Sequence, residues 1–96
     1  MTVYAIAQLS IHDRPRYESY AARFASVLTR YGGRLLAADE RPRVVEGQWD
    51  RDKVVLLAFP DHDAFTAWAD SPEYQEISRD RLAAAGGPVL LVRGVT

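Results

Sequence analysis

Two short polar segments combine histidine with aspartate and are the first candidates for chemistry. His12-Asp13 follows one apolar run and Asp61-His62-Asp63 follows another. If the two segments met in the fold, their imidazole and carboxylate groups would suit a divalent metal or general acid–base catalysis. The alternative is structural, because aspartate is a common helix N-cap and a histidine beside it is commonly a solvated loop residue. No His-x-x-x-His spacing supports a metal, and we expect none.

Aromatic residues form a second group of candidates. Tyrosine and tryptophan combine an apolar ring with a polar tip, so they can line a pocket that orients an aromatic or oxygenated ligand. The alternative is that these rings belong to the core and their polar tips reach water at its rim. The residues expected to bind substrate are Tyr20, Trp49, Trp68 and Tyr74.

Glu46 lies between Val45 and Gly47, in a segment that reads as a strand, which is an unusual place for a carboxylate. Buried near Arg34, it would either form an ion pair or act as a general base. If the protein is an enzyme, we expect Glu46 or His12 to transfer protons while the aromatic residues position the substrate.

The elements that position these residues follow from the hydrophobic pattern. Residues 3–10 alternate with a period of two, which is typical of a strand. Asp13 is a suitable N-cap for a helix whose apolar residues recur every three or four positions as far as Tyr31. Gly32-Gly33 then ends that helix.

Three further strands and a second helical region are expected downstream. Residues 34–39 and 43–49 form either two short strands or one bent edge strand, and residues 53–59 form the most apolar strand. A helical region divided at Ser71-Pro72 follows, and residues 89–95 form the last strand.

This order is β-α-β-β-α-β, and it predicts an α+β ferredoxin-like domain over residues 1–96. Two helices should cover one face of a four-stranded antiparallel sheet. We also expect the strands at 3–10 and 53–59 to be parallel neighbours, so that His12-Asp13 and Asp61-His62-Asp63 would begin helices at the same end of the sheet.

Both sides of the predicted strands are apolar. In residues 53–59, for example, Val54 and Leu56 point to one side and Val55 and Leu57 to the other. Two helices shield only one face of the sheet. Burying ~600–800 Å² of apolar area on the other face, at ~25 cal/mol per Å², would drive association of two chains. The pattern therefore predicts a homodimer through the sheet face; the alternative is a monomer with an exposed apolar sheet.

Composition excludes several classes of function. The chain has 96 residues, 12 Lys+Arg against 13 Asp+Glu, and no cysteine. This balance indicates no nucleic-acid or membrane partner, and Arg43–Trp49 lacks the stacking aromatic residues of an RNA-recognition strand. The paired glycines lack the spacing and the following lysine of a phosphate loop, so we expect no cofactor. Neither a signal peptide nor a membrane span is visible, which predicts a cytoplasmic protein.

Several local strings together resemble a known family. They are Tyr31-Gly32-Gly33-Arg34, Glu46-Gly47-x-Trp49, Phe59-Pro60, Trp68-x-x-Ser71-Pro72-x-Tyr74 and Arg81. Nearly the whole chain is similar to the bacterial domain-of-unknown-function family thirteen-thirty, in the dimeric α/β-barrel superfamily. The resemblance implies a ferredoxin-like subunit and a dimer whose two sheets face each other. Other branches of the superfamily include cofactor-free monooxygenases, isomerases and haem enzymes.

Two function classes remain open from the sequence. One is a small cofactor-free enzyme, oxygenase-like or isomerase-like, with a pocket between helices and sheet. The other is a non-catalytic dimeric module that binds a small ligand in the same pocket.

Overall fold

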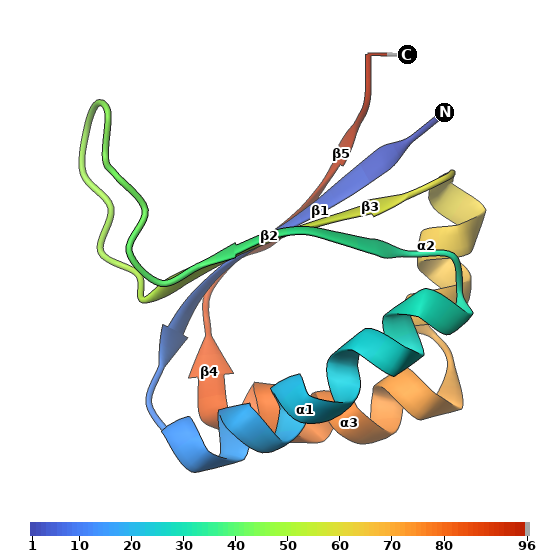
Figure 1. The fold of residues 1–96 in the computed structure, drawn as a ribbon, viewed down its shortest axis with the longest axis horizontal. Coiled ribbons are helices and arrows are strands. Elements are labelled where there is room, and N and C mark those ends of the chain that lie inside the picture. Colours follow the sequence, from blue (N-terminus) through green and yellow to red (C-terminus); the bar gives the residue numbers. More distant parts are fainter. Residues whose placement is uncertain (96) are drawn as a thin grey trace.

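The computed structural model describes residues 1–95, which form five strands and three helices (Figure 1). Thr96, the last residue of the predicted domain, lies outside the described residues. The elements are β1 (Val3–Ile11), α1 (Arg14–Arg30), β2 (Arg34–Asp39), β3 (Lys53–Phe59), α2 (His62–Ala69), α3 (Pro72–Ala84), β4 (Ala85–Gly86) and β5 (Val89–Arg93).

All strand pairs in the sheet are antiparallel. β2 pairs with β3, β3 with β1, and β1 with β5, while the short β4 pairs with the end of β1. The predicted α+β antiparallel fold is therefore confirmed, with two differences in detail. The sheet has five strands instead of four within the described chain, because residues 85–86 pair briefly with Ser10 and Ile11. The second helical region is divided at Ser71 as predicted, but its two parts are separate helices, so the described chain has three helices instead of two.

The helices lie on one face of the sheet (Figure 1), where α1 packs along α3. Each helix begins with the cap that the sequence predicted. Asp13 accepts a hydrogen bond from the Arg16 backbone N–H at 3.3 Å, and Asp61 accepts one from Ala64 at 2.8 Å. Ser71 accepts one from the Tyr74 N–H at 3.1 Å. These bonds satisfy N–H groups that have no partner inside the helix.

Residues 40–52 differ from the prediction. They form an irregular arm that extends away from the body of the molecule (Figure 1), so the strand predicted at 43–49 is wrong. A strand needs a neighbour for its hydrogen bonds, but the pairing of β2 with β3 stops at Asp39 and Val54. Pro42 lacks an N–H, and Gly47 has a φ of +82°, which turns the chain out of extended geometry.

The core lies between the sheet and the helices. The largest of its fully buried side chains are Leu9 and Phe59 from the sheet and Leu28 from α1. Gly33 lets α1 approach β3, because a Cβ there would lie 2.4 Å from Leu28 and 2.8 Å from Phe59. None of the helices within residues 1–95 has the length and apolar character needed to cross a bilayer.

Candidate functional site

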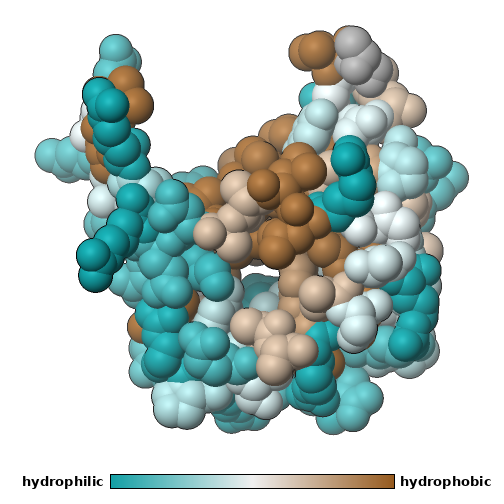
Figure 2. Space-filling model, in the orientation of Figure 1, coloured by the Kyte–Doolittle hydropathy of each residue, from teal (hydrophilic) through white to brown (hydrophobic). Residues whose placement is uncertain are grey.

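The core is incompletely filled, and a cavity of about 440 Å³ lies between the sheet and the helices. Its floor consists of side chains from β1 and β3, including Ala7 and Val55, and α1 and α3 form its walls. The small side chains Ala21 and Ala25 on α1 leave part of this space open. In the space-filling view the molecule is hollowed at this level, between the sheet and the helices (Figure 2).

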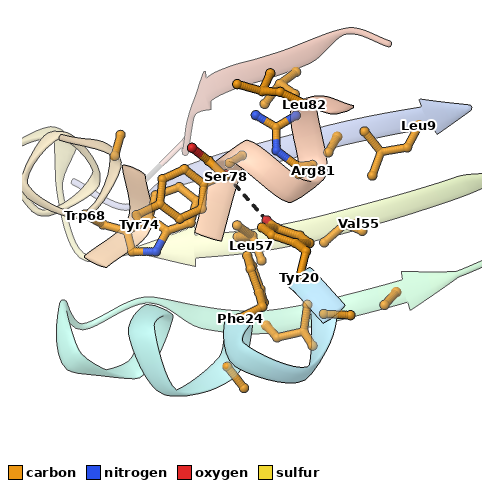
Figure 3. A pocket seen from close by; sticks show the side chains of 18 of the residues that line it. Leu9, Tyr20, Phe24, Val55, Leu57, Trp68, Tyr74, Ser78, Arg81 and Leu82 are labelled. Atoms are coloured by element: carbon orange, nitrogen blue, oxygen red, sulfur yellow. Dashed lines mark hydrogen bonds between the residues drawn. The ribbon is translucent and has the colours of Figure 1, made fainter. Parts of the chain in front are cut away.

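One wall of the cavity is aromatic. The rings of Trp68 and Tyr74 lie 4.0 Å apart between centroids, and the ring of Phe24 meets Trp68 edge-on at 6.1 Å. Tyr20 reaches across from α1, and its hydroxyl lies 3.4 Å from the Tyr74 hydroxyl (Figure 3). Such a wall suits a flat, unsaturated molecule, because aromatic rings pack by edge and by offset stacking.

The Tyr20 hydroxyl remains protonated. Burial raises the pKa of Tyr20 well above its ordinary value, the Tyr74 phenol raises it further, and the positive charge of Arg81 acts in the opposite direction. Tyr20 can therefore donate or accept a hydrogen bond inside the cavity, but it does not serve as a base at neutral pH.

Polar groups on the cavity wall come mainly from α3 and β3. Tyr74, Ser78 and Arg81 follow one another at spacings of four and three, so they share one face of α3. Lys53 lines the cavity from β3, with its ammonium 4.9 Å from the centroid of the Tyr17 ring. The site residues predicted from the sequence did not include Lys53, Ser78 and Arg81, although the spacing of the last two from Tyr74 could have identified them.

Two buried donors at the cavity are unpartnered within residues 1–95. They are the indole N–H of Trp68 and the Nε–H of Arg81. Asp70 is the one carboxylate in the described cavity lining, and no histidine lines it there. The arrangement can hold and orient a small molecule, but it supplies few groups that exchange protons near neutral pH.

The structure brings three of the predicted site residues together and leaves three apart. Tyr20, Trp68 and Tyr74 line the cavity. Trp49 lies at the base of the arm and donates its indole N–H to Gln8 Oε1 at 3.2 Å, on the other face of the sheet. His12 is exposed, with Nε2 3.1 Å from the Ala83 carbonyl oxygen.

Glu46 is exposed on the arm. The condition of burial near Arg34 is therefore not met, and no ion pair between these two residues exists within residues 1–95. The physical reason is the arm itself, because residues 40–52 leave the sheet before Glu46 is reached.

The predicted meeting of the two histidine–aspartate segments is also wrong. Val3 pairs with Phe59 and Leu9 with Lys53, so β1 and β3 run in opposite directions. The connection from β2 reverses the chain before β3, which places the helix starts at Asp13 and Asp61 at opposite ends of the sheet. Within the described residues no group of three His, Cys, Asp or Glu side chains could hold a metal ion.

The face of the sheet away from the helices is apolar and uncovered. Leu90 and Val92 on β5 are 49% and 38% exposed, and they pair with Ile6 and Tyr4 on β1. Leu56 of β3 lies on the same side, next to Ile6. Figure 2 shows apolar side chains gathered on this surface, between the arm on one side and the chain ends on the other.

Comparison with known proteins supports the fold. The sequence matches a family described as "Domain of unknown function (DUF1330)" over residues 2–95. No curated protein matches it. The RPA0582 protein of unknown function from Rhodopseudomonas palustris has a similar structure, with a TM-score of 0.83 and 18% identity over 99% of this chain and 83% of that one.

Two further solved structures are similar. SnoaB, a cofactor-independent oxygenase from Streptomyces nogalater, has a TM-score of 0.71 and 18% identity over 99% of this chain and 94% of its own. A dimeric ferredoxin-like protein of unknown function from Jannaschia sp. CCS1 has a TM-score of 0.70 and 21% identity over 96% of each chain. At these identities the likeness shows a ferredoxin-like fold and no more.

Proposed function

The chain belongs to the DUF1330 family, and on that premise we propose that it is a homodimeric, cofactor-free enzyme acting on a small molecule. The reaction class we propose is oxygenase-like or isomerase-like. The observation that carries the proposal is the cavity of about 440 Å³ between sheet and helices. Its volume lies within the range of about 300–1,000 Å³ that is typical of ligand sites.

The cavity residues supply binding and orientation. Trp68 and Tyr74 are 5% and 8% exposed and provide a flat apolar wall, and the hydroxyl of Tyr20, which also lines the cavity, can form a hydrogen bond with a ligand. The fold shared with SnoaB supports the oxygenase class as an analogy between folds. Proton transfer by Glu46 or His12 remains part of the proposal, although neither lines the cavity within one subunit. Any contact of Glu46 with a cavity would have to be made across the dimer.

A non-catalytic binding module is the second candidate function. The specific observation in its favour is that the described cavity lining contains no histidine and has Asp70 as its one carboxylate. Such a module would use the same aromatic wall and the same Tyr20 hydroxyl, and it would release its ligand unchanged.

Native mass spectrometry of the freshly purified protein tests these proposals. A retained small molecule identifies a ligand, which is then extracted and incubated with fresh protein under air and under nitrogen. Turnover that needs air supports the oxygenase, and rearrangement without dioxygen supports the isomerase. Recovery of the unchanged ligand under both conditions favours the binding module. If turnover is found, Glu46→Gln and His12→Gln test the proton-transfer roles, and full activity in either variant removes that residue from the mechanism.

We further propose that a second copy of the chain covers the open face of the sheet. Tyr4, Ile6, Leu56, Leu90 and Val92 share this face, and leaving them in water is unfavourable at ~25 cal/mol per Å². A similar structure is described as dimeric. In analytical ultracentrifugation Leu90→Glu should sediment as a monomer, while Ala22→Glu on the exposed side of α1 should remain a dimer. A wild-type monomer at micromolar concentration would refute the proposal.

A further inference from the structure

We propose that the ligand of the cavity is a compact aromatic carboxylate whose charge is recognised by Arg81. This inference rests on the proposed function, because it assigns a ligand class to the same cavity. It is carried by the position of Arg81, by the charges on the cavity wall and by the aromatic surface beside them.

Arg81 is the one partly buried arginine within residues 1–95 that has no carboxylate partner. Other arginines there either pair with an acid or are exposed to water. Its neighbour Asp80 is no partner, because Asp80 binds Arg16 and Arg23 at 3.0 Å each. The Nε–H of Arg81 is covered by protein and donates to no acceptor in the described chain.

A guanidinium in this position is costly unless an anion compensates for its lost hydration. A carboxylate is the natural complement, since its two oxygens match the planar fork of arginine donors. Arg81 lines the cavity on the same face of α3 as Tyr74 and Ser78, so a molecule in the cavity lies next to it (Figure 3).

The charged side chains of the described cavity lining are two cations and one carboxylate. Lys53 and Arg81 line the cavity against the single carboxylate of Asp70, although the whole chain has a net charge of −1. Asp70 caps the end of α2 and is exposed, so water screens its charge. The protonated hydroxyl of Tyr20 is a further donor available to a carboxylate oxygen.

The remaining surface selects the body of the ligand. Phe24, Trp68 and Tyr74 present rings to one another at centroid distances between 4.0 and 6.1 Å. A flat ring fits against this wall, and a carboxylate attached to the ring would point toward the polar groups of α3 and β3. A long aliphatic acid would leave the rings without a matching partner.

Isothermal titration calorimetry with two probes of nearly equal shape tests the charge. The probes are 1-naphthoate and the neutral 1-naphthamide. For the wild type we expect naphthoate to bind about ten-fold more tightly than naphthamide. Arg81→Gln should lose this preference while its affinity for naphthamide changes by less than about two-fold. Arg79→Gln, an exposed arginine on the same helix, should retain the wild-type preference.

The outcomes separate the two proposals. Equal binding of both probes by the wild type, or an unchanged preference in Arg81→Gln, refutes the carboxylate inference and leaves the cavity as a ligand site. Absence of binding of both probes refutes the cavity proposal, and the inference with it. If Arg81→Gln does not fold, Arg81→Lys takes its place. This variant keeps the charge but loses the planar fork of donors, so its preference for naphthoate over naphthamide should be reduced. The comparison of the two probes on the wild type tests the inference without any variant.

Discussion

Filling the cavity from α1 should stabilise the protein and abolish ligand binding. Ala21 lines the cavity of about 440 Å³, and Ala21→Leu adds three carbon atoms at its wall. Burial of each carbon contributes about 0.8 kcal/mol, and fixing the leucine side chain costs about 0.5–1 kcal/mol. The expected net gain in the free energy of unfolding is therefore about 1.5–2 kcal/mol.

Urea unfolding followed by circular dichroism measures this gain, and calorimetry with 1-naphthoate measures the loss of binding. All variants are compared at one protein concentration, because dissociation of a dimer contributes to its apparent stability. Ala22→Leu is the matched control. Ala22 is exposed on the next position of the same helix, so leucine there should change the unfolding free energy by less than about 0.5 kcal/mol and leave binding intact.

Two results would refute the reasoning. A loss of more than about 1 kcal/mol in Ala21→Leu would show that the space is already occupied by side chains, since overpacking a filled core destabilises it. A stabilised Ala21→Leu variant that still binds naphthoate with wild-type affinity would place the ligand elsewhere.

Two further predictions concern packing and pH. Gly33→Ala should lower the free energy of unfolding by about 1–3 kcal/mol in urea titrations, because its Cβ would meet the buried side chains of Leu28 and Phe59. Gly86→Ala is the control and should have little effect, because the space around Gly86 is open. The hydrogen bond from Arg16 and the charge of Arg23 hold the pKa of Asp80 below its usual value. These ion pairs therefore stabilise the fold fully at a pH above the ordinary carboxylate pKa. Their contribution is lost as the pH falls through the lowered pKa of Asp80. Asp80→Asn should therefore lower the urea midpoint at about pH 7, and the difference from wild type should shrink toward about pH 2; an equal difference at both pH values would contradict this.

Local sequence signals predicted most of the elements correctly because they act over a few residues. The N-caps Asp13, Asp61 and Ser71 each bond an N–H three residues ahead. The period-two pattern of residues 3–10 and 53–59 places alternate side chains on opposite faces of a strand, and this spacing alone revealed two apolar faces. The strand predicted at 43–49 was wrong because strand formation depends on a neighbour, which no local pattern contains.

The candidate site depended more on tertiary structure. The spacing of Tyr74, Ser78 and Arg81 places them on one helical face, and this could be read from the sequence. Their meeting with Tyr20, 54 residues from Tyr74, required α1 to pack against α3. The same argument explains why the histidine–aspartate segments do not meet: the direction of β3 relative to β1 decides which ends of the sheet they occupy.

The sequence by itself thus determined most of the elements, their order, their caps and the two-sided apolarity of the sheet, since each follows from contacts between residues close in the chain. Only the tertiary structure decided that small side chains on α1 leave a cavity above the sheet and that Arg81 lies beside it without a carboxylate partner in the described chain. Cavities and unpaired charges are properties of how separate elements pack, and packing depends on the shapes of side chains that are distant in sequence.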